Sequence, residues 1–226
     1  MKNVLLILDE KMIAVNVVET AIKISKTNRS AIQVLFTHSQ SRSASDDSST
    51  KNKNLVTGMC SDAGIEVVIL NENDIPLNLV LQQDPSINLV IAESPKAANA
   101  PTITTHLANA KCPVYLISAD SNKIGNIIFS YDGSFSSINA IKEYTQRFPE
   151  TLKLPTHFVQ LSSDDNDEFL RQKNIESWLP QSYSNAQYSI FNGDTRTEFF
   201  NFIASIPDCL AVIGSHWNKR GNHLVY

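Results

Sequence analysis

The stretch Asn126–Tyr131 reads NIIFSY and leads directly into the tripeptide Asp-Gly-Ser at 132–134. Near the start of the chain an equally short apolar run, Val4–Leu8, leads into Asp9, so a strand-then-aspartate pattern occurs twice at an offset of 123 residues. Short β-branched runs that alternate with segments of helical spacing are typical of a parallel sheet covered by helices. The two stretches therefore predict the first strands of two similar α/β halves.

A second pair of apolar runs supports the same duplication. Leu210–Ile213 resembles Leu89–Ala92 at an offset of 121 residues, close to the offset of the first pair. Two landmarks with nearly equal offsets indicate an internal repeat. We expect two tandem domains, residues 1–122 and 123–226, each an open parallel five-stranded sheet flanked by helices.

The remaining elements of both halves follow from hydrophobic periodicity. In the first half we expect a helix with apolar positions from Ala14 to Ile22, helices over Pro76–Gln83 and Ile103–Ala110, and strands at Val4–Leu8, Ile32–Phe36, Ile65–Leu70, Leu89–Ala92 and Val114–Ile117. In the second half we expect helices around Ile138 to Phe148, Glu168–Leu179 and Arg196–Ala204, and strands at Asn126–Tyr131, His157–Leu161, Gln187–Phe191 and Leu210–Ile213.

Two segments depart from this regular pattern. Ser39–Asn54 consists almost entirely of Ser, Asn, Lys, Asp and Thr, a composition that predicts a mobile surface loop. The fifth strand of the second half would fall beyond Tyr226. The second domain is therefore expected to lack its last strand, either as a truncated product or because its sheet takes an edge from a partner chain.

Composition narrows the class of protein. The formal net charge is -4, with 19 Lys and Arg against 23 Asp and Glu, so the chain has little positive charge with which to bind the phosphate backbone of a nucleic acid. The three cysteines, Cys60, Cys112 and Cys209, form no CxxC pair, and no apolar run is long enough for a membrane span. We expect a cytoplasmic protein without a disulfide framework, a metal site, a membrane or a nucleic-acid partner.

Candidate binding residues lie where strand order reverses in such a sheet, beyond the carboxyl ends of the strands. Asp132, Gly133 and Ser134 offer a carboxylate, a flexible backbone and a hydroxyl, which can bond a ribose or a base or can cap the following helix. After the fourth strand, backbone N–H groups and cationic tips can cradle an anion. The residues of that segment are Gly214, Ser215, His216, Lys219, Arg220 and Gly221.

These motifs resemble the universal stress protein family. The resemblance rests on the strand followed by Asp132-Gly133-Ser134, with Ser137 and Ala140 after it, and on Val212-Ile213-Gly214-Ser215-His216. It implies tandem domains similar to adenine nucleotide alpha hydrolases, with strand order 3-2-1-4-5. It also implies pairing through the last strand, and the family has nucleotide-binding and non-binding branches.

In the binding branch, an aspartate after the first strand contacts the adenine end and a glycine-rich stretch holds ribose and phosphates. Asp132 matches the former, whereas Trp217 and Arg220 occupy positions where small residues are expected, and Gly221 matches only after a one-residue slip. In the first half the segment from Glu93 to Ala97 has no glycine, and Asp9 with Glu93 would repel an anion.

The sequence thus predicts a binding or regulatory protein of the stress response, not an enzyme, with a degenerate nucleotide pocket. Phosphate-loop, Gly-x-Ser-x-Gly and His-Glu-x-x-His motifs are all absent from the sequence, so no catalytic residue is assigned. No cofactor is certain; ATP or AMP is the candidate ligand, and a homodimer or another protein the candidate partner. The alternative is an ATP-binding universal stress protein with slow ATP hydrolysis through the second domain.

Overall fold

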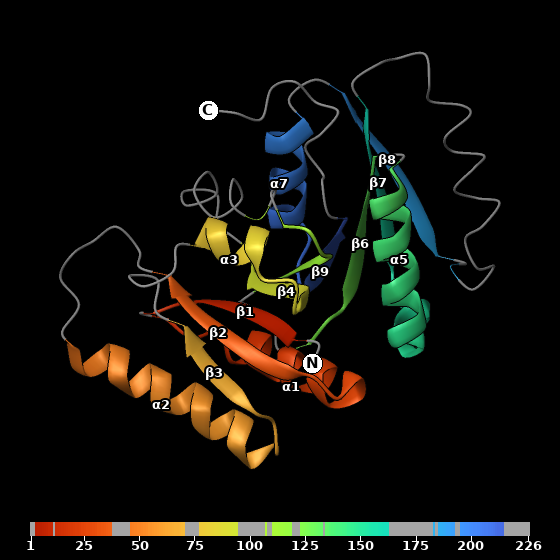
Figure 1. Cartoon of the computed structure of the whole chain (residues 1–226). Coiled ribbons are helices and arrows are strands. Elements are labelled where there is room, and N and C mark those ends of the chain that lie inside the picture. Colours follow the sequence, from red (N-terminus) through yellow and green to blue (C-terminus); the bar gives the residue numbers. More distant parts are fainter. Residues whose placement is uncertain are drawn as a thin grey trace.

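The computed structural model describes residues 3–10, 12–37, 46–70, 77–94, 107, 110–118, 123–132, 134–162, 183, 185–192 and 195–214 (Figure 1). Its strands are β1 (Asn3–Asp9), β2 (Ala31–Thr37), β3 (Val67–Leu70), β4 (Ile87–Glu93), β5 (Val114–Ile117), β6 (Asn126–Tyr131), β7 (Thr156–Ser162), β8 (Ala186–Asn192) and β9 (Cys209–Ile213). Its helices are α1 (Val15–Asn28), α2 (Asp46–Asp62), α3 (Leu77–Gln83), α5 (Phe135–Arg147), the 3-10 helix η1 (Pro149–Lys153) and α7 (Thr195–Ser205).

These strands form one sheet of nine strands in the order β3-β2-β1-β4-β5-β9-β6-β7-β8. The prediction of two separate sheets is therefore wrong in this respect. Neighbouring strands are parallel except β5 and β9, which pair antiparallel from Val114↔Ile213 to Ile117↔Leu210. An unpaired strand edge exposes backbone N–H and C=O groups, and here the last strand of the first half and β9 satisfy each other. Of the two alternatives for the missing last strand, an edge taken from a partner chain is not needed, because β5 of the same chain pairs with β9.

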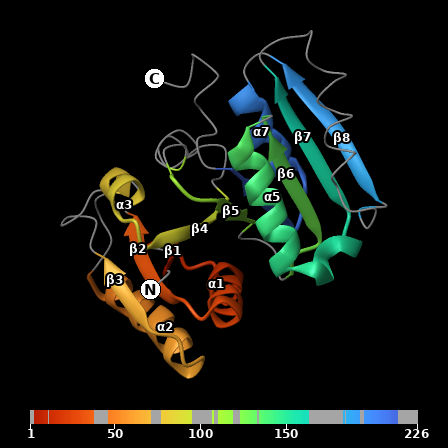
Figure 2. The same cartoon turned by 45° about the vertical axis from the view of Figure 1, so that its right-hand side comes forward.

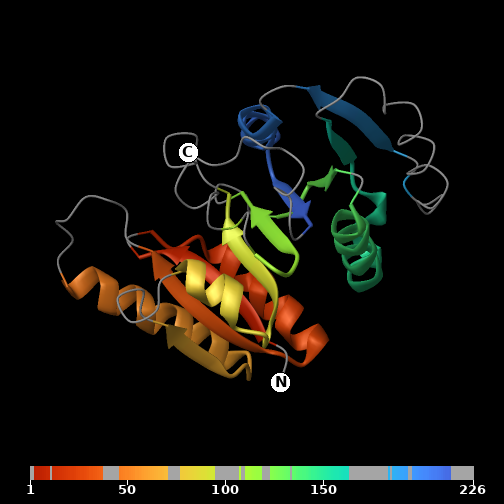
Figure 3. The same ribbon diagram turned by 45° about the horizontal axis from the view of Figure 1, so that its top comes forward.

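The strands of the two halves follow the same order from the outer edges of the sheet toward this junction. The first half runs β3-β2-β1-β4 and the second half runs β8-β7-β6-β9, so each begins with its third strand, followed by its second, first and fourth. Figure 3 shows β4 and β5, in yellow and light green, between the red strands of the first half and the blue β9. Each half therefore places its first and fourth strands side by side.

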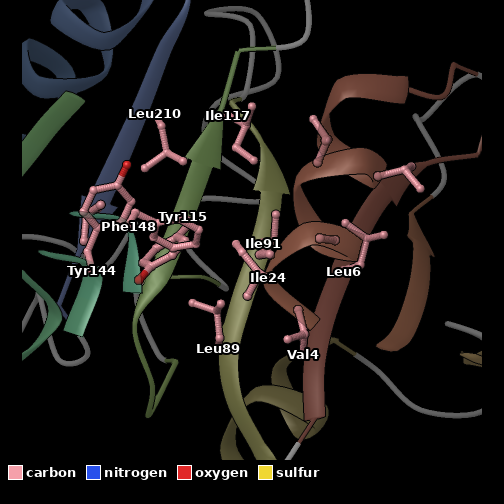
Figure 4. Close-up of a cluster of buried hydrophobic side chains, with 14 of the residues drawn as sticks. Val4, Leu6, Ile24, Leu89, Ile91, Tyr115, Ile117, Tyr144, Phe148 and Leu210 are labelled. Atoms are coloured by element: carbon pink, nitrogen blue, oxygen red, sulfur yellow. The ribbon is translucent and has the colours of Figure 1, made fainter. Parts of the chain in front are cut away.

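One row of side chains crosses all nine strands in register. It is aliphatic from β3 to β4 and, apart from Val212, aromatic from β5 to β8; its members are Ile69, Val34, Leu6, Ile91, Tyr115, Val212, Phe129, Phe158 and Tyr188. Ring contacts continue the row, with centroids 5.1 Å apart for Phe129 and Phe158 and 5.4 Å for Phe158 and Tyr188. The core is consequently continuous across the junction (Figure 4).

Helices cover both faces of the sheet, as expected of a parallel α/β fold. The row above lies on the face covered by α1, α2 and α5, which bury Val17, Val56 and Tyr144 among others in one cluster. The opposite cluster contains Val80 of α3 and Phe199 of α7. No described helix combines the length and the apolar composition needed to cross a membrane.

The predicted strands are confirmed, with ends that differ by two residues at most. The predicted loop at Ser39–Asn54 is wrong over its second part, because α2 includes Asp46–Asn54. Burial of Val56 and Cys60 anchors this helix on the sheet, and tertiary packing overrides the polar composition of its first turns. The predicted helix Glu168–Leu179 and most of Ile103–Ala110 lie outside the described residues.

Tyr115 occupies the centre of the junction. Its ring is fully buried against Tyr144, with centroids 5.5 Å apart, and burial raises the pKa of its phenol. Its hydroxyl has no hydrogen-bond partner among the described residues. A buried polar group without a partner costs about 1–3 kcal/mol, so the Tyr115 hydroxyl weakens the junction that its ring stabilises.

Tyr115→Phe is therefore expected to raise the free energy of unfolding by about 1 kcal/mol, because it removes only the unpartnered hydroxyl. The matched control is Tyr183→Phe, since the Tyr183 hydroxyl bonds the Thr145 hydroxyl at 2.6 Å. That change should lower the free energy by about 1 kcal/mol. Urea unfolding measures both, and destabilisation by Tyr115→Phe would show that its hydroxyl has a partner.

Candidate functional site

The candidate site of the second half lies at the carboxyl ends of β6 and β9. These strands are parallel neighbours, with Phe129 opposite Val212, so they end at the same edge of the sheet. Asp132 directly follows β6, and Gly214 directly follows β9. The topology thus brings together two predicted site residues that are far apart in the sequence.

Asp132 and Ser134 shape the entry into α5. An Asp132 Oδ1 atom accepts a hydrogen bond from the Ser134 backbone N–H at 2.9 Å, which closes a tight turn. Ser134 is the N-cap, and its Oγ accepts from the Ser137 N–H at 3.2 Å. Of the two roles left open for this tripeptide, the structure shows the helix cap.

The first turn of α5 gathers hydroxyl groups. Ser134 Oγ lies 3.0 Å from Ser136 Oγ, and Ser137 Oγ donates to the Ser134 carbonyl at 2.9 Å. No acidic residue lies in this turn. The positive end of the helix dipole therefore combines here with side chains that can donate hydrogen bonds.

Gly214 touches this turn with its backbone. A Cβ atom at this position would lie 2.5 Å from the Ser137 nitrogen and 2.6 Å from the Ser137 Cα. Real side chains do not approach backbone atoms so closely, so only glycine fits where β9 passes the start of α5. Gly214 is thus a packing residue in addition to being a candidate for binding.

Three further residues at this edge were not identified from the sequence. Phe135, the first residue of α5, is 83% exposed, so it presents an aromatic ring beside Ser134. Ser130 of β6 and Gln160 of β7 are buried, and Ser130 Oγ and Gln160 Nε2 have no described hydrogen-bond partner. In the sequence, Ser130 and Gln160 could have been found as polar residues close to the ends of predicted strands.

At the corresponding edge of the first half, Glu10, the residue that follows β1, is bound by α2. The side chain of Glu10 receives a hydrogen bond from Ser49 and an ion pair from Lys53 at 3.3 Å, and its carbonyl accepts from Asn52 at 2.7 Å. All three partners belong to α2, so these contacts join this helix to the residue that follows β1. Sequence reasoning missed this contact because it expected a loop at Ser39–Asn54.

Asp9 and Glu93 lie at the ends of the parallel neighbours β1 and β4, where Ile7 is opposite Ala92. The structure thus places both carboxylates at one edge, as the topology predicts. Of the second-half candidates, it places Asp132 and Gly214, whereas Gly133, Ser215, His216 and Gly221 lie outside the described residues.

Comparison with known proteins bears on the fold. No protein-family model matches the chain, and no curated protein matches it in sequence. In structure it is similar to a universal stress protein from Archaeoglobus fulgidus DSM 4304, with a TM-score of 0.55 and 12% sequence identity. The match covers 94% of this chain and 98% of that chain. The chain therefore has an α/β fold like that of a universal stress protein, with a mostly parallel sheet.

Gly214→Ala is expected to lower the free energy of unfolding by about 1–3 kcal/mol, because the added methyl group meets backbone that cannot easily move. Gly58→Ala is the matched control: Gly58 lies within α2 and a Cβ there meets nothing within 4 Å. That change should raise the free energy by about 0.5–1 kcal/mol. Equal effects of the two changes in chemical unfolding would rule out the close contact at Gly214.

Proposed function

We propose that this chain is a cytoplasmic binding protein of the stress response, similar to universal stress proteins, that acts through partners and not through catalysis. Its second half holds a degenerate adenine-nucleotide pocket, and its first half serves as a scaffold. The main support for the proposal is that Asp132 and Gly214 both contact the start of α5, Asp132 through the Ser134 N–H and Gly214 through the Ser137 backbone. The fold supplies the family analogy, which by itself does not fix function.

We infer a degenerate pocket because Asp132 and Gly214 already make contacts within the protein. Asp132 already accepts a hydrogen bond from the turn, and the Gly214 backbone is pressed against Ser137. Trp217 and Arg220 stand where the family pattern calls for small residues. A nucleotide would have to compete with these contacts, so we expect weak affinity for ATP or AMP, or none.

The scaffold role of the first half rests on Glu10. Its contacts with Ser49 and Lys53 join α2 to the end of β1, and Asp9 and Glu93 add carboxylates at the same edge. Asp9 and Glu93 would disfavour a negatively charged phosphate at this edge, whereas the charge of Glu10 is paired with Lys53. This half therefore contributes the sheet edge that β9 requires and is not expected to bind a nucleotide.

The second candidate function is ATP binding with slow hydrolysis through the second half. Three observations favour it: the hydroxyl groups of the first turn of α5, the exposed ring of Phe135, and the Nε2 atom of Gln160, which has no described partner and lies on the face of the sheet that α5 covers. A purine can stack on an aromatic ring, and helix N-termini favour phosphate. The two candidates differ in whether the pocket is occupied at cellular nucleotide concentrations.

Thermal unfolding of the full chain with millimolar ATP or AMP, with and without magnesium, separates them, because a ligand that binds the folded state must raise the midpoint. The degenerate pocket predicts an unchanged midpoint. A clear upward shift would contradict it and would favour the ATP-binding alternative.

If the midpoint does shift with nucleotide, the variant Asp132→Asn tests whether the nucleotide binds at this site. The change keeps an acceptor for the Ser134 N–H but removes the charge. The control is Asp84→Asn, because Asp84 makes the same turn with the Ser86 N–H at 2.8 Å elsewhere in the protein. A shift that disappears in Asp132→Asn and persists in Asp84→Asn belongs to the second-half pocket. A shift that persists in both variants excludes Asp132 from the binding.

A further inference from the structure

β8 is an outer strand of the sheet. It pairs with β7 along all seven of its residues, from Thr156↔Ala186 to Ser162↔Asn192. Its other side pairs with no strand among the described residues, and Figure 2 shows β8 and β3 at opposite ends of the sheet. Such an edge is a template for another strand.

The sequence of β8 carries none of the usual protections of an edge. It reads AQYSIFN, with no charged residue, proline or glycine. Edge strands are commonly kept from pairing by short length, charges or proline. The opposite edge, β3, has only four residues and directly follows the exposed Glu66. Of the two edges, β8 is the one suited to a second strand.

Apolar surface continues to this edge on both faces of the sheet. On one face the Tyr188 ring stacks on Phe158 at an interplanar angle of 18° and is still 40% exposed. On the other, Phe191 contacts Phe202 with ring centroids 5.5 Å apart. The row of core side chains that crosses the sheet therefore ends at Tyr188, where a further strand would cover it.

We propose that β8 pairs antiparallel with β8 of a second copy of this chain, about a two-fold axis at Ser189. Full overlap of seven residues places Ser189 opposite itself and Tyr188 opposite Ile190 of the partner subunit. A closed two-fold pair uses the same surface on both copies, and the absence of charge in β8 removes like-charge repulsion. The chain already joins its own halves by an antiparallel pairing of edges, at β5 and β9.

This inference rests on the proposed function, because it makes a second copy of the chain one of the partners through which the protein acts. Its test measures oligomeric state without nucleotide, so it can fail independently of nucleotide binding. We expect light scattering coupled to size exclusion to show twice the chain mass for the wild type. The double change Gln187→Lys and Ser189→Lys should weaken the dimer roughly tenfold or more, because it brings two positive charges together at position 189 and adds two more at position 187, diagonally across the pair. The control Val68→Lys lies at the other edge, on a residue 46% exposed, and should leave the dimer intact.

A wild-type chain that stays monomeric at all concentrations would overturn the proposal, and so would a dimer that survives the double change. Cross-linking gives a readout independent of folding defects. Ser189→Cys should form a disulfide between copies under mild oxidation, because opposed residues in an antiparallel pair have Cα atoms about 4.5–5.5 Å apart. Val68→Cys and the wild type should not cross-link. Equal cross-linking of all three, or none by Ser189→Cys, contradicts a two-fold axis at that residue.

Discussion

The antiparallel pairing of β5 with β9 is the interaction on which the rest of the structure depends. Without it, each half would expose a strand edge in the middle of the molecule, and Tyr115 would lose its contact with the second half. With it, one row of side chains runs from Ile69 to Tyr188, and the buried cluster on each face of the sheet includes residues of both halves. The two similar halves therefore stabilise each other through backbone hydrogen bonds and through shared burial.

The same topology determines where function can lie. First and fourth strands are neighbours in both halves, yet their carboxyl edges differ in chemistry. In the first half Glu10 is held by α2, whereas in the second half Asp132 turns the chain into α5 and Gly214 contacts the first turn of that helix. A shared fold thus carries two edges with different contacts: in the first, hydroxyl and cationic side chains of α2 bind Glu10, whereas in the second the serine hydroxyl groups at the start of α5 bond within their own turn.

The sequence was sufficient for the strands because buried parallel strands are short apolar runs that stand out from their surroundings. It was also sufficient to place Asp132 near Gly214, since strand topology brings these positions together. It failed at α2, where the polar turns before Val56 form a helix through tertiary contacts. The β5–β9 junction and the close approach of Gly214 to Ser137 were missed because each depends on a distant partner and has no local pattern.

Hydrogen exchange of the β5 amides, followed residue by residue by NMR, tests the junction most directly. In a strand, successive N–H groups point to opposite sides, so an edge strand protects only every second amide. Because β5 lies between β4 and β9, all four amides from Val114 to Ile117 are predicted to exchange slowly. Fast exchange at alternate amides would show that β5 is an open edge and would contradict the single continuous sheet.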